Sequence, residues 1–211
     1  MAKLVEGTRD LDVEPFRRFD PPGRVLAKHA AVLVLLGEGP AGPDVLLLLR
    51  SDELGSHAGQ VAFPGGKADD TDDGPIETAL REAMEETGVL PEGVRPVAVM
   101  PELYVSVSKF LVTPVIAHWQ ESSPVRAVDP RETAAVARVP LDHLADPANR
   151  FMVRHPSGFT GPAFSAPDML VWGFTAGVLT LVLAIGGWER PWDTTDVRDL
   201  DVAWRSSRPE V

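Results

Sequence analysis

Three closely spaced glutamates give the strongest chemical signal in this sequence. Glu82, Glu85 and Glu86 occupy positions i, i+3 and i+4 of the segment Arg81-Glu82-Ala83-Met84-Glu85-Glu86-Thr87-Gly88-Val89. On an α-helix this spacing places three carboxylates on one face, where they repel one another unless a cation lies among them. Clustered carboxylate oxygens are the ligands that hard divalent cations prefer. The spacing therefore indicates a metal site, with a solvated acidic face on a surface helix as the alternative.

The residues around these glutamates predict a well-bounded helix that holds them rigidly. Pro75 suits the first helical turn, Asp72-Asp73 lies at the positive end of the helix dipole, and Gly88 suits the left-handed position that ends a helix. The opposite face is apolar at helical spacing, and we expect it to pack on the core through Ile76, Ala79, Leu80, Ala83 and Met84.

The segment Gly65–Val89 resembles the sequence signature of the Nudix hydrolases. That signature reads Gly, five residues, Glu, seven residues, and then Arg-Glu-apolar-any-Glu-Glu-any-Gly-apolar. Arg81–Val89 matches the second half at every specified position. In the first half, Asp73 stands where the signature has Glu, Lys67 stands where it has Gly, and Gly66 comes one residue early. The resemblance implies an α/β protein with the Nudix fold, an α/β/α sandwich with a mixed central β-sheet.

An upstream segment resembles the coenzyme A pyrophosphatase branch of the same family. Leu46–Ser51 and His57–Gly66 are similar to the motif of that branch in residue type and spacing. Two positions depart from it, because Leu48 replaces a Thr and Gly55 replaces an Arg. The chain therefore lacks one guanidinium of the kind that holds a phosphate through two hydrogen bonds.

The resemblance implies a role for each residue of the signature. Glu82, Glu85, Glu86 and the Gly66 carbonyl are the expected metal ligands, and Mg²⁺ or Mn²⁺ is the expected cofactor. We expect Arg81 to hold one of these carboxylates in position, although an ordinary i to i+4 pair with Glu85 would make the same contact.

The general base is expected among the acidic residues of the same region. Glu82 or Glu85 could accept the proton of the attacking water, and Glu132 is a rival because its segment resembles a loop that contributes an acid in some relatives. A solvated loop position explains Glu132 equally well. Asp73 is expected to be a helix-end or loop carboxylate.

Substrate contacts are expected from the upstream motif and its surroundings. Arg50, His57 and Lys67 are candidates to meet phosphates, whereas Phe63 and Tyr104 are candidates for apolar walls. A surface loop position for His57 and a core position for Phe63 are the alternatives. Trp172 is expected to pack within a C-terminal helix, as aromatic residues in apolar runs usually do.

The implied reaction is hydrolysis of a diphosphate with the help of a divalent ion. The resemblance implies coenzyme A or its derivatives as the substrate, cleaved to 3′,5′-ADP and 4′-phosphopantetheine or its acyl form. Another nucleoside diphosphate derivative, such as ADP-ribose or an ADP-sugar, is the nearest alternative. A non-catalytic ligand-binding protein with the Nudix fold is the alternative from a different class.

The composition is consistent with a single-domain enzyme. The chain has 211 residues, is 44% hydrophobic, contains no cysteine and carries a net charge of −11. This length allows a sizeable core, and the lack of cysteine excludes disulfides and thiolate chemistry. The acidic balance disfavours nucleic acid as a partner. We expect a cytoplasmic enzyme, and the resemblance implies a possible homodimer.

Apolar runs and turn residues predict the order of the secondary-structure elements. A hairpin is expected over Ala30–Leu36 and Val45–Leu49, joined by the Gly-Pro-rich turn Gly37–Pro43. Further strands are expected over Val94–Met100 and Phe110–Ala117, a short helix or turn over Pro140–Leu144, and a longer helix over Leu170–Ile185.

The domain limits follow from the same pattern. We expect an N-terminal extension over 1–28, the Nudix domain over 29–186 and a polar C-terminal tail over 187–211. The extensions could pack on the domain, pack on a partner subunit or stay mobile. The uncharged run Met169–Gly187 is slightly short of the ~20 residues that span a bilayer, so it predicts a buried helix and no membrane partner.

Overall fold

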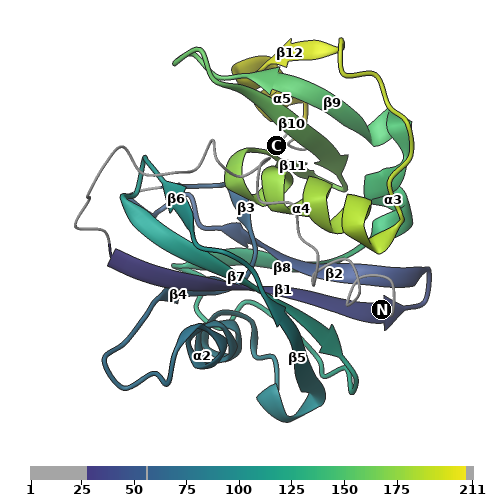
Figure 1. Cartoon of the computed structure of the whole chain (residues 1–211). Coiled ribbons are helices and arrows are strands. Elements are labelled where there is room, and N and C mark those ends of the chain that lie inside the picture. The colour runs from purple at the N-terminus through teal and green to yellow at the C-terminus, as the bar shows by residue number, and fades with distance from the viewer. Residues whose placement is uncertain (1–27, 56, 208–211) are drawn as a thin grey trace.

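The computed structural model describes residues 28–55 and 57–207. Most of the expected N-terminal extension, 1–27, therefore lies outside the described residues. The described chain forms two β-sheets and four α-helices, with α4 packed between the sheets (Figure 1). Helix α2 (Pro75–Thr87) covers the face of the larger sheet that is turned away from α4. The α/β/α sandwich with a mixed central sheet is confirmed, and a second sheet lies beyond it.

The larger sheet has eight strands and is built around the expected hairpin. Its main order is β3-β2-β1-β7-β5, while β4 also pairs with β1, β6 with β7 and β8 with β2. The pairing of β1 with β7 is parallel and the other pairings are antiparallel, so the sheet is mixed. The strands are β1 (Lys28–Gly39), β2 (Gly42–Arg50), β3 (Val61–Ala62), β4 (Gly65–Lys67), β5 (Val94–Val99), β6 (Leu103–Val105), β7 (Phe110–Trp119) and β8 (Thr133–Pro140).

The smaller sheet has four strands in the order β11-β10-β9-β12. Its strands are β9 (Arg150–Arg154), β10 (Thr160–Ala166), β11 (Met169–Val171) and β12 (Val197–Asp199). The remaining helices are α3 (Leu141–Ala145), α4 (Gly173–Gly186) and α5 (Leu200–Ser206). Single 3-10 turns occur at Pro91–Gly93 and Pro147–Asn149.

The alternation of side chains along β1 divides the main core into two layers. Val34 and Leu36 pack on the α4 side, together with Leu179 of α4. Leu33 and Leu35 point to the other side, where they meet the residues of α2. Since successive side chains of a strand point to opposite faces, one central strand organises both layers and fixes α2 against the sheet.

Three expectations about the elements were wrong in part. The apolar face expected for α2 is buried only in part, because Ala79 and Ala83 are fully buried and Leu80 packs on the core, whereas Ile76 and Met84 are 39% and 44% exposed. The helix expected over Leu170–Ile185 starts only at Gly173, since residues 169–171 form β11. Trp172 consequently precedes α4 and packs on a core cluster of the smaller sheet, where its ring stacks on that of His155.

The expected C-terminal tail, 187–211, contains regular structure that packs on the domain. Strand β12 pairs in parallel with β9, and Leu200 and Ala203 of α5 pack on Phe151 and Leu170. Packing on the domain is therefore the alternative that holds for residues 197–206.

Candidate active site

Helix α2 begins and ends where its sequence predicts. Gly74 is the N-cap and Pro75 follows it in the first turn. Gly88 adopts the left-handed conformation with φ 72°, and its N–H donates to the carbonyl of Met84. The buried stripe consists of the small side chains Thr78, Ala79, Ala83 and Thr87, which let the helix approach the sheet closely. Glu82 and Glu86 are thereby directed along the side of the helix that faces β4.

Strand β4 and the glutamates meet at very short range. The amide N–H of Gly65 donates to Oε2 of Glu86 at 2.9 Å. A Cβ added at Gly66 would lie 2.6 Å from Oε1 of Glu82, so a side chain at this position would displace that carboxylate. Gly66 therefore lets β4 approach Glu82 closely. Because successive side chains of a strand point to opposite faces, the exposed side chain of Lys67 lies on the other face.

Arg81 joins the loop before α2 to the glutamates. Its Nε and Nη2 donate to the two carboxylate oxygens of Asp72, each at 3.0 Å, and Nη2 also donates to the Lys67 carbonyl at 3.0 Å. Nη1 donates to Glu82 at 3.0 Å and to Glu85 at 3.3 Å. The contact with Glu85 is the ordinary i to i+4 pair, and the contacts with Asp72 and Lys67 go beyond it. Arg81 thus positions two of the three candidate ligands.

Asp72 is the residue of this site that sequence reasoning missed. Beyond the Arg81 contacts, its carboxylate accepts bonds from Thr78 Oγ1 at 2.8 Å and from the Asp69 amide at 2.9 Å. The hydrogen bonds from Arg81 hold the pKa of Asp72 well below its usual range. The only sequence signal was an acidic residue in the loop, since a contact between residues nine apart has no helical periodicity.

Burial is the largest cause of the raised pKa values of Glu82 and Glu86. Burial raises the pKa of Glu86 to about 7, while the Gly65 hydrogen bond and the charge of Arg50 oppose this rise. Burial also raises the pKa of Glu82, and Arg81 opposes it. Glu85 is the most exposed of the three, with a side chain 54% exposed. Two half-buried carboxylates and one exposed one form an acidic patch in which a cation would lower the cost of ionisation.

The candidate ligand atoms are of the type that a hard divalent cation prefers, but the side chains do not converge on one position. All candidate ligands are oxygens, as Mg²⁺ and Mn²⁺ require. Among residues 28–55 and 57–207, however, no three His, Asp or Glu side chains converge closely enough to hold a metal ion as they stand. Glu82 and Glu85 bond to Arg81, and Glu86 bonds to Gly65. Metal binding would require these bonds to rearrange.

Arg50 and Glu132 lie close enough to Glu86 for their charges to act on it. The amide of Ser51, at the end of β2, donates to the Glu132 carbonyl at 2.9 Å, which fixes these segments together. The charges of both Arg50 and Glu132 influence the pKa of Glu86, Arg50 by lowering it and Glu132 by raising it. The Arg50 Nε atom is buried and has no hydrogen-bond partner among the described residues. The structure thus brings Arg50, Glu86 and Glu132 together.

Other expected contacts are placed elsewhere. Phe63 is 2% exposed and lies in the core beside α4, which is the alternative that the sequence left open. Tyr104 is 9% exposed, so neither ring forms an open wall. His57 lies in the loop between β2 and β3, where its Nδ1 is 2.9 Å from Gln60 Oε1. Asp73 is an exposed loop residue.

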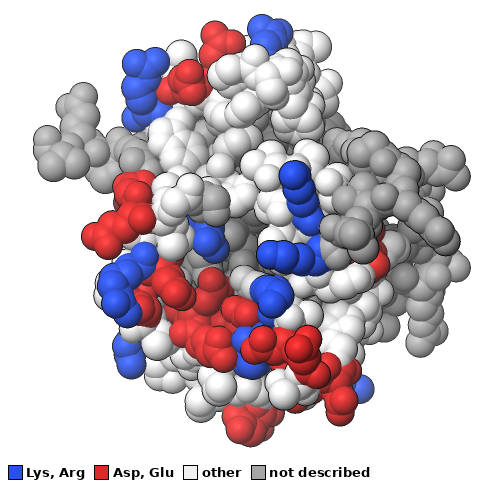
Figure 2. Space-filling model, turned by 90° about the vertical axis from the view of Figure 1, so that its left-hand side faces the viewer, with Lys and Arg blue, Asp and Glu red and all other residues white. Residues whose placement is uncertain are grey.

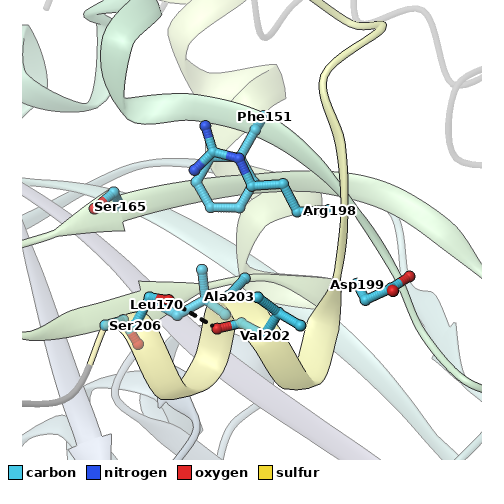
Figure 3. A pocket seen from close by; sticks show the side chains of 9 residues that line it. Phe151, Ser165, Leu170, Arg198, Asp199, Val202, Ala203 and Ser206 are labelled. Atoms are coloured by element: carbon cyan, nitrogen blue, oxygen red, sulfur yellow. Dashed lines mark hydrogen bonds between the residues drawn. The ribbon is translucent and has the colours of Figure 1, made fainter.

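A separate cavity of about 340 Å³ lies between α5 and the smaller sheet (Figure 3). The guanidinium of Arg198 lies over the Phe151 ring at 3.9 Å, and Val202 and Ser206 line the cavity from α5. Asp196 offsets the charge of Arg198 through a bidentate pair. This cavity contains none of the residues grouped around Glu86, so it is not part of the candidate active site.

Comparisons with known proteins agree with this geometry. The family model of the NUDIX domain matches residues 27–156. The chain is 39% identical over 163 residues to the protein named Uncharacterized Nudix hydrolase NudL of Escherichia coli K12, a match that covers 75% of this chain and 83% of that protein. It is 40% identical, with the same coverage, to the protein of that name from Shigella boydii serotype 4.

Solved structures support the fold in the same way. The Nudix hydrolase RenU of M. smegmatis superposes with a TM-score of 0.54 at 22% identity, covering 79% of this chain and 90% of that one. A NUDIX hydrolase from Nitrosomonas europaea gives a TM-score of 0.50 at 11% identity, with 83% and 81% covered.

The fold, the glutamate helix and these matches define one class of protein, and the chain belongs to the Nudix hydrolase family. Nudix hydrolases act on small nucleoside diphosphate compounds and generally use divalent metals such as Mg²⁺ or Mn²⁺. None of the described helices is long and apolar enough to cross a membrane.

Proposed function

We propose that this Nudix hydrolase cleaves the diphosphate of coenzyme A or its derivatives, releasing 3′,5′-ADP and 4′-phosphopantetheine or its acyl form. The observation that carries the proposal is the grouping of Arg50, from the upstream motif, with Glu86 and Glu132 beside β4. A motif of the coenzyme A pyrophosphatase branch and the glutamates of the Nudix signature thus contribute to one site. The relative NudL, whose name gives no substrate, leaves this choice to experiment.

The residues of the site would divide the work of hydrolysis. Glu82, Glu85, Glu86 and the Gly66 carbonyl would hold a divalent ion, which supplies neutralisation of the phosphate oxygens and orientation of the attacking water when bound. Arg81 orients Glu82 and Glu85, and Gly66 leaves the space that Glu82 occupies. The buried Nε–H of Arg50, which has no partner in the part of the chain that the structure describes, could donate to a phosphate oxygen.

Glu82, Glu85 and Glu132 remain the candidates for the general base. Burial raises the pKa of Glu82, which brings this carboxylate closer to the range in which a base works well near neutral pH. Glu132 is exposed and lies beside Glu86, so it can accept a proton from water on the open side of the site. Replacing each by Gln, and comparing the pH dependence of kcat, separates the three candidates.

The substrate is tested by an assay with Mg²⁺ or Mn²⁺ on coenzyme A, ADP-ribose, NADH and dinucleoside polyphosphates, with identification of the products. We expect coenzyme A to give the highest kcat/KM. Preferred cleavage of another compound would replace coenzyme A by the alternative nucleoside diphosphate substrates. No cleavage of any compound under either metal would favour the non-catalytic ligand-binding protein.

The role of the glutamates is tested by Glu85→Gln and Glu86→Gln. Each substitution keeps the shape of the side chain and removes one negative charge, so we expect kcat to fall by on the order of 100-fold or more while metal affinity also falls. Circular dichroism should show an unchanged fold. Unchanged turnover in both variants would refute their role as ligands.

A further inference from the structure

The lysines of this chain are few, and most of them lie together. The sequence contains four lysines, Lys3, Lys28, Lys67 and Lys109, among 20 basic residues. Lys3 lies outside the described residues, and the other three occur at one end of the larger sheet, where β1, β4 and β7 meet. All three side chains are exposed. Most basic residues of this chain are arginines, and the three lysines among the described residues all lie at this end of the larger sheet.

Strand pairing explains how residues far apart in sequence come together there. Lys67 of β4 is the antiparallel partner of Ala30, two residues after Lys28 on β1. Paired residues and residues two apart point to the same face of a sheet, so Lys28 and Lys67 share a face, as diagonal neighbours about 7–8 Å apart. Lys28 is also the parallel partner of Phe110, and Lys109 immediately precedes that residue.

The shared face is the one opposite α2. Along β1, Val32, Val34 and Leu36 continue the alternation of Lys28 and pack on the α4 side. The glutamates of α2 reach β4 from the other side, since Glu82 lies against Gly66, the neighbour of Lys67. One short strand therefore separates Lys28 and Lys67 from the candidate metal ligands.

The charges on this side of the molecule are sharply divided. On the side of the molecule that lies at the left of Figure 1, Figure 2 shows Lys and Arg side chains above a band of Asp and Glu. No ion pair joins Lys28, Lys67 or Lys109 to any carboxylate of the described residues. In a chain of net charge −11, three cations that have no ion-pair partner within residues 28–55 and 57–207 form a local site of attraction for anions.

We propose that Lys28, Lys67 and Lys109 form a cationic subsite that binds a phosphomonoester of the substrate, a phosphate other than the diphosphate that is cleaved. The inference rests on the proposed function, because it places the diphosphate at the glutamates on one side of β4 and the further phosphate on the other. Ammonium groups act as strongly hydrated point charges and suit a mobile phosphate dianion. The subsite selects nucleotides that carry a phosphate on the ribose in addition to the diphosphate.

Binding of 3′,5′-ADP and of AMP tests the subsite without any turnover. These compounds differ by one phosphomonoester, and neither contains a phosphoanhydride. Calorimetry on the full-length wild type should show 3′,5′-ADP binding about tenfold or more tightly than AMP. The double variant K28Q/K109Q should lose this preference and keep its affinity for AMP, whereas the control R205Q, on α5, should retain both. The preference should also shrink at high ionic strength.

Three outcomes would overturn the subsite: equal affinities in the wild type, no measurable binding of either nucleotide, or a preference that persists in K28Q/K109Q. A parallel assay compares coenzyme A with dephospho-coenzyme A, which lacks the ribose phosphate. In K28Q/K109Q we expect KM for coenzyme A alone to rise, with kcat retained. If the wild type cleaves neither compound, the proposed function fails, and the binding preference still decides the subsite by itself.

Discussion

At the scale of single residues, the site depends on one position that lacks a side chain. Gly66 lies against the Glu82 carboxylate, and the space that a Cβ would need is already filled. Gly66 is not among the residues with positive φ, so its role is one of space and not of backbone conformation. A side chain at this position would act on the reaction through Glu82.

Gly66→Ala should keep the fold and reduce activity. The new methyl group would push Glu82 out of place, and a displacement of about 1 Å at a reacting site can cost on the order of 100-fold in rate. The matched control is Gly55→Ala, since a Cβ at Gly55 meets nothing within 4 Å. Steady-state kinetics of both variants, with thermal unfolding for stability, is the measurement. Equal activity of the two variants would show that Glu82 tolerates the displacement.

Asp72 should contribute stability that depends on pH. Its pKa is held below the unfolded value of about 3.9 by Arg81, so its contribution is fully present above that value and is lost as the pH falls through the folded-state pKa. Urea unfolding of the wild type and Asp72→Asn should differ most at neutral pH and converge in acid. Asp73→Asn removes the same charge from an exposed neighbour and should leave the curve almost unchanged.

Sequence reasoning found the glutamates, Gly66 and Arg81 because their spacing is local to one helix and one turn. It could not find Asp72, whose contact with Arg81 depends on how the loop at 68–74 folds back on α2. It also gave Phe63 two alternatives, because an aromatic ring next to a glycine turn suits a substrate wall and a core equally well. Only the packing of Phe63 beside α4 shows that it is a core residue.

At the scale of elements, α2 is rotated so that only part of its expected apolar face is buried. Thr78, Ala79, Ala83 and Thr87 are buried, and both threonine hydroxyls are hydrogen-bonded, to Asp72 and to the Ala83 carbonyl. Satisfied hydroxyls on small side chains can be buried at little cost. Hydrophobicity alone therefore misjudges which stripe of this helix meets the sheet.

The corrected orientation predicts opposite effects for two neighbouring positions. Met84→Ala removes a side chain that is 44% exposed and should change the free energy of unfolding by about 0.5 kcal/mol or less. Ala83→Leu adds volume where the residue is fully buried and should destabilise by about 1–3 kcal/mol. Chemical denaturation of both variants is the measurement. A large loss for Met84→Ala with a tolerated Ala83→Leu would contradict the observed rotation.

The strands of the hairpin, β5 and β7 were predictable because each is dominated by apolar and β-branched residues. The expected Val94–Met100 and Phe110–Ala117 agree with β5 and β7, and the expected short helix at 140–144 agrees with α3. The smaller sheet was not predictable in the same way. Its strands are short and include Pro162 and charged residues, so they lack a clear alternation.

At the scale of the whole molecule, the C-terminal residues complete the smaller sheet. Leu200 of α5 is 6% exposed and packs on the core cluster that contains Phe151 and Leu170. Arg150, whose side chain is fully buried, lies over the rings of Phe164 and Trp192 at 5.1 and 4.5 Å. Both contacts tie residues beyond 186 to the body of the protein.

Leu200→Ala should therefore destabilise the protein by about 2–5 kcal/mol, as expected for a buried leucine. Val202→Ala, on the same helix and 53% exposed, should change stability by about 0.5 kcal/mol or less. Thermal and urea unfolding of the full-length variants is the measurement. If both variants unfold at the same temperature and urea concentration as the wild type, the packing of α5 does not stabilise the protein.

The three guanidinium nitrogens of Arg81 have different partners, and this has a consequence for metal binding. Nε and Nη2 donate hydrogen bonds to Asp72 and to the Lys67 carbonyl, whereas only Nη1 donates to Glu82 and Glu85. Without a metal ion, the guanidinium of Arg81 already places a positive charge beside Glu82 and Glu85. A divalent ion held by the three glutamates would replace the two Nη1 hydrogen bonds and the bond from Gly65 to Glu86. The Nε and Nη2 bonds to Asp72 and Lys67 would not have to break, so the loop at 68–74 would remain attached to α2 during the exchange.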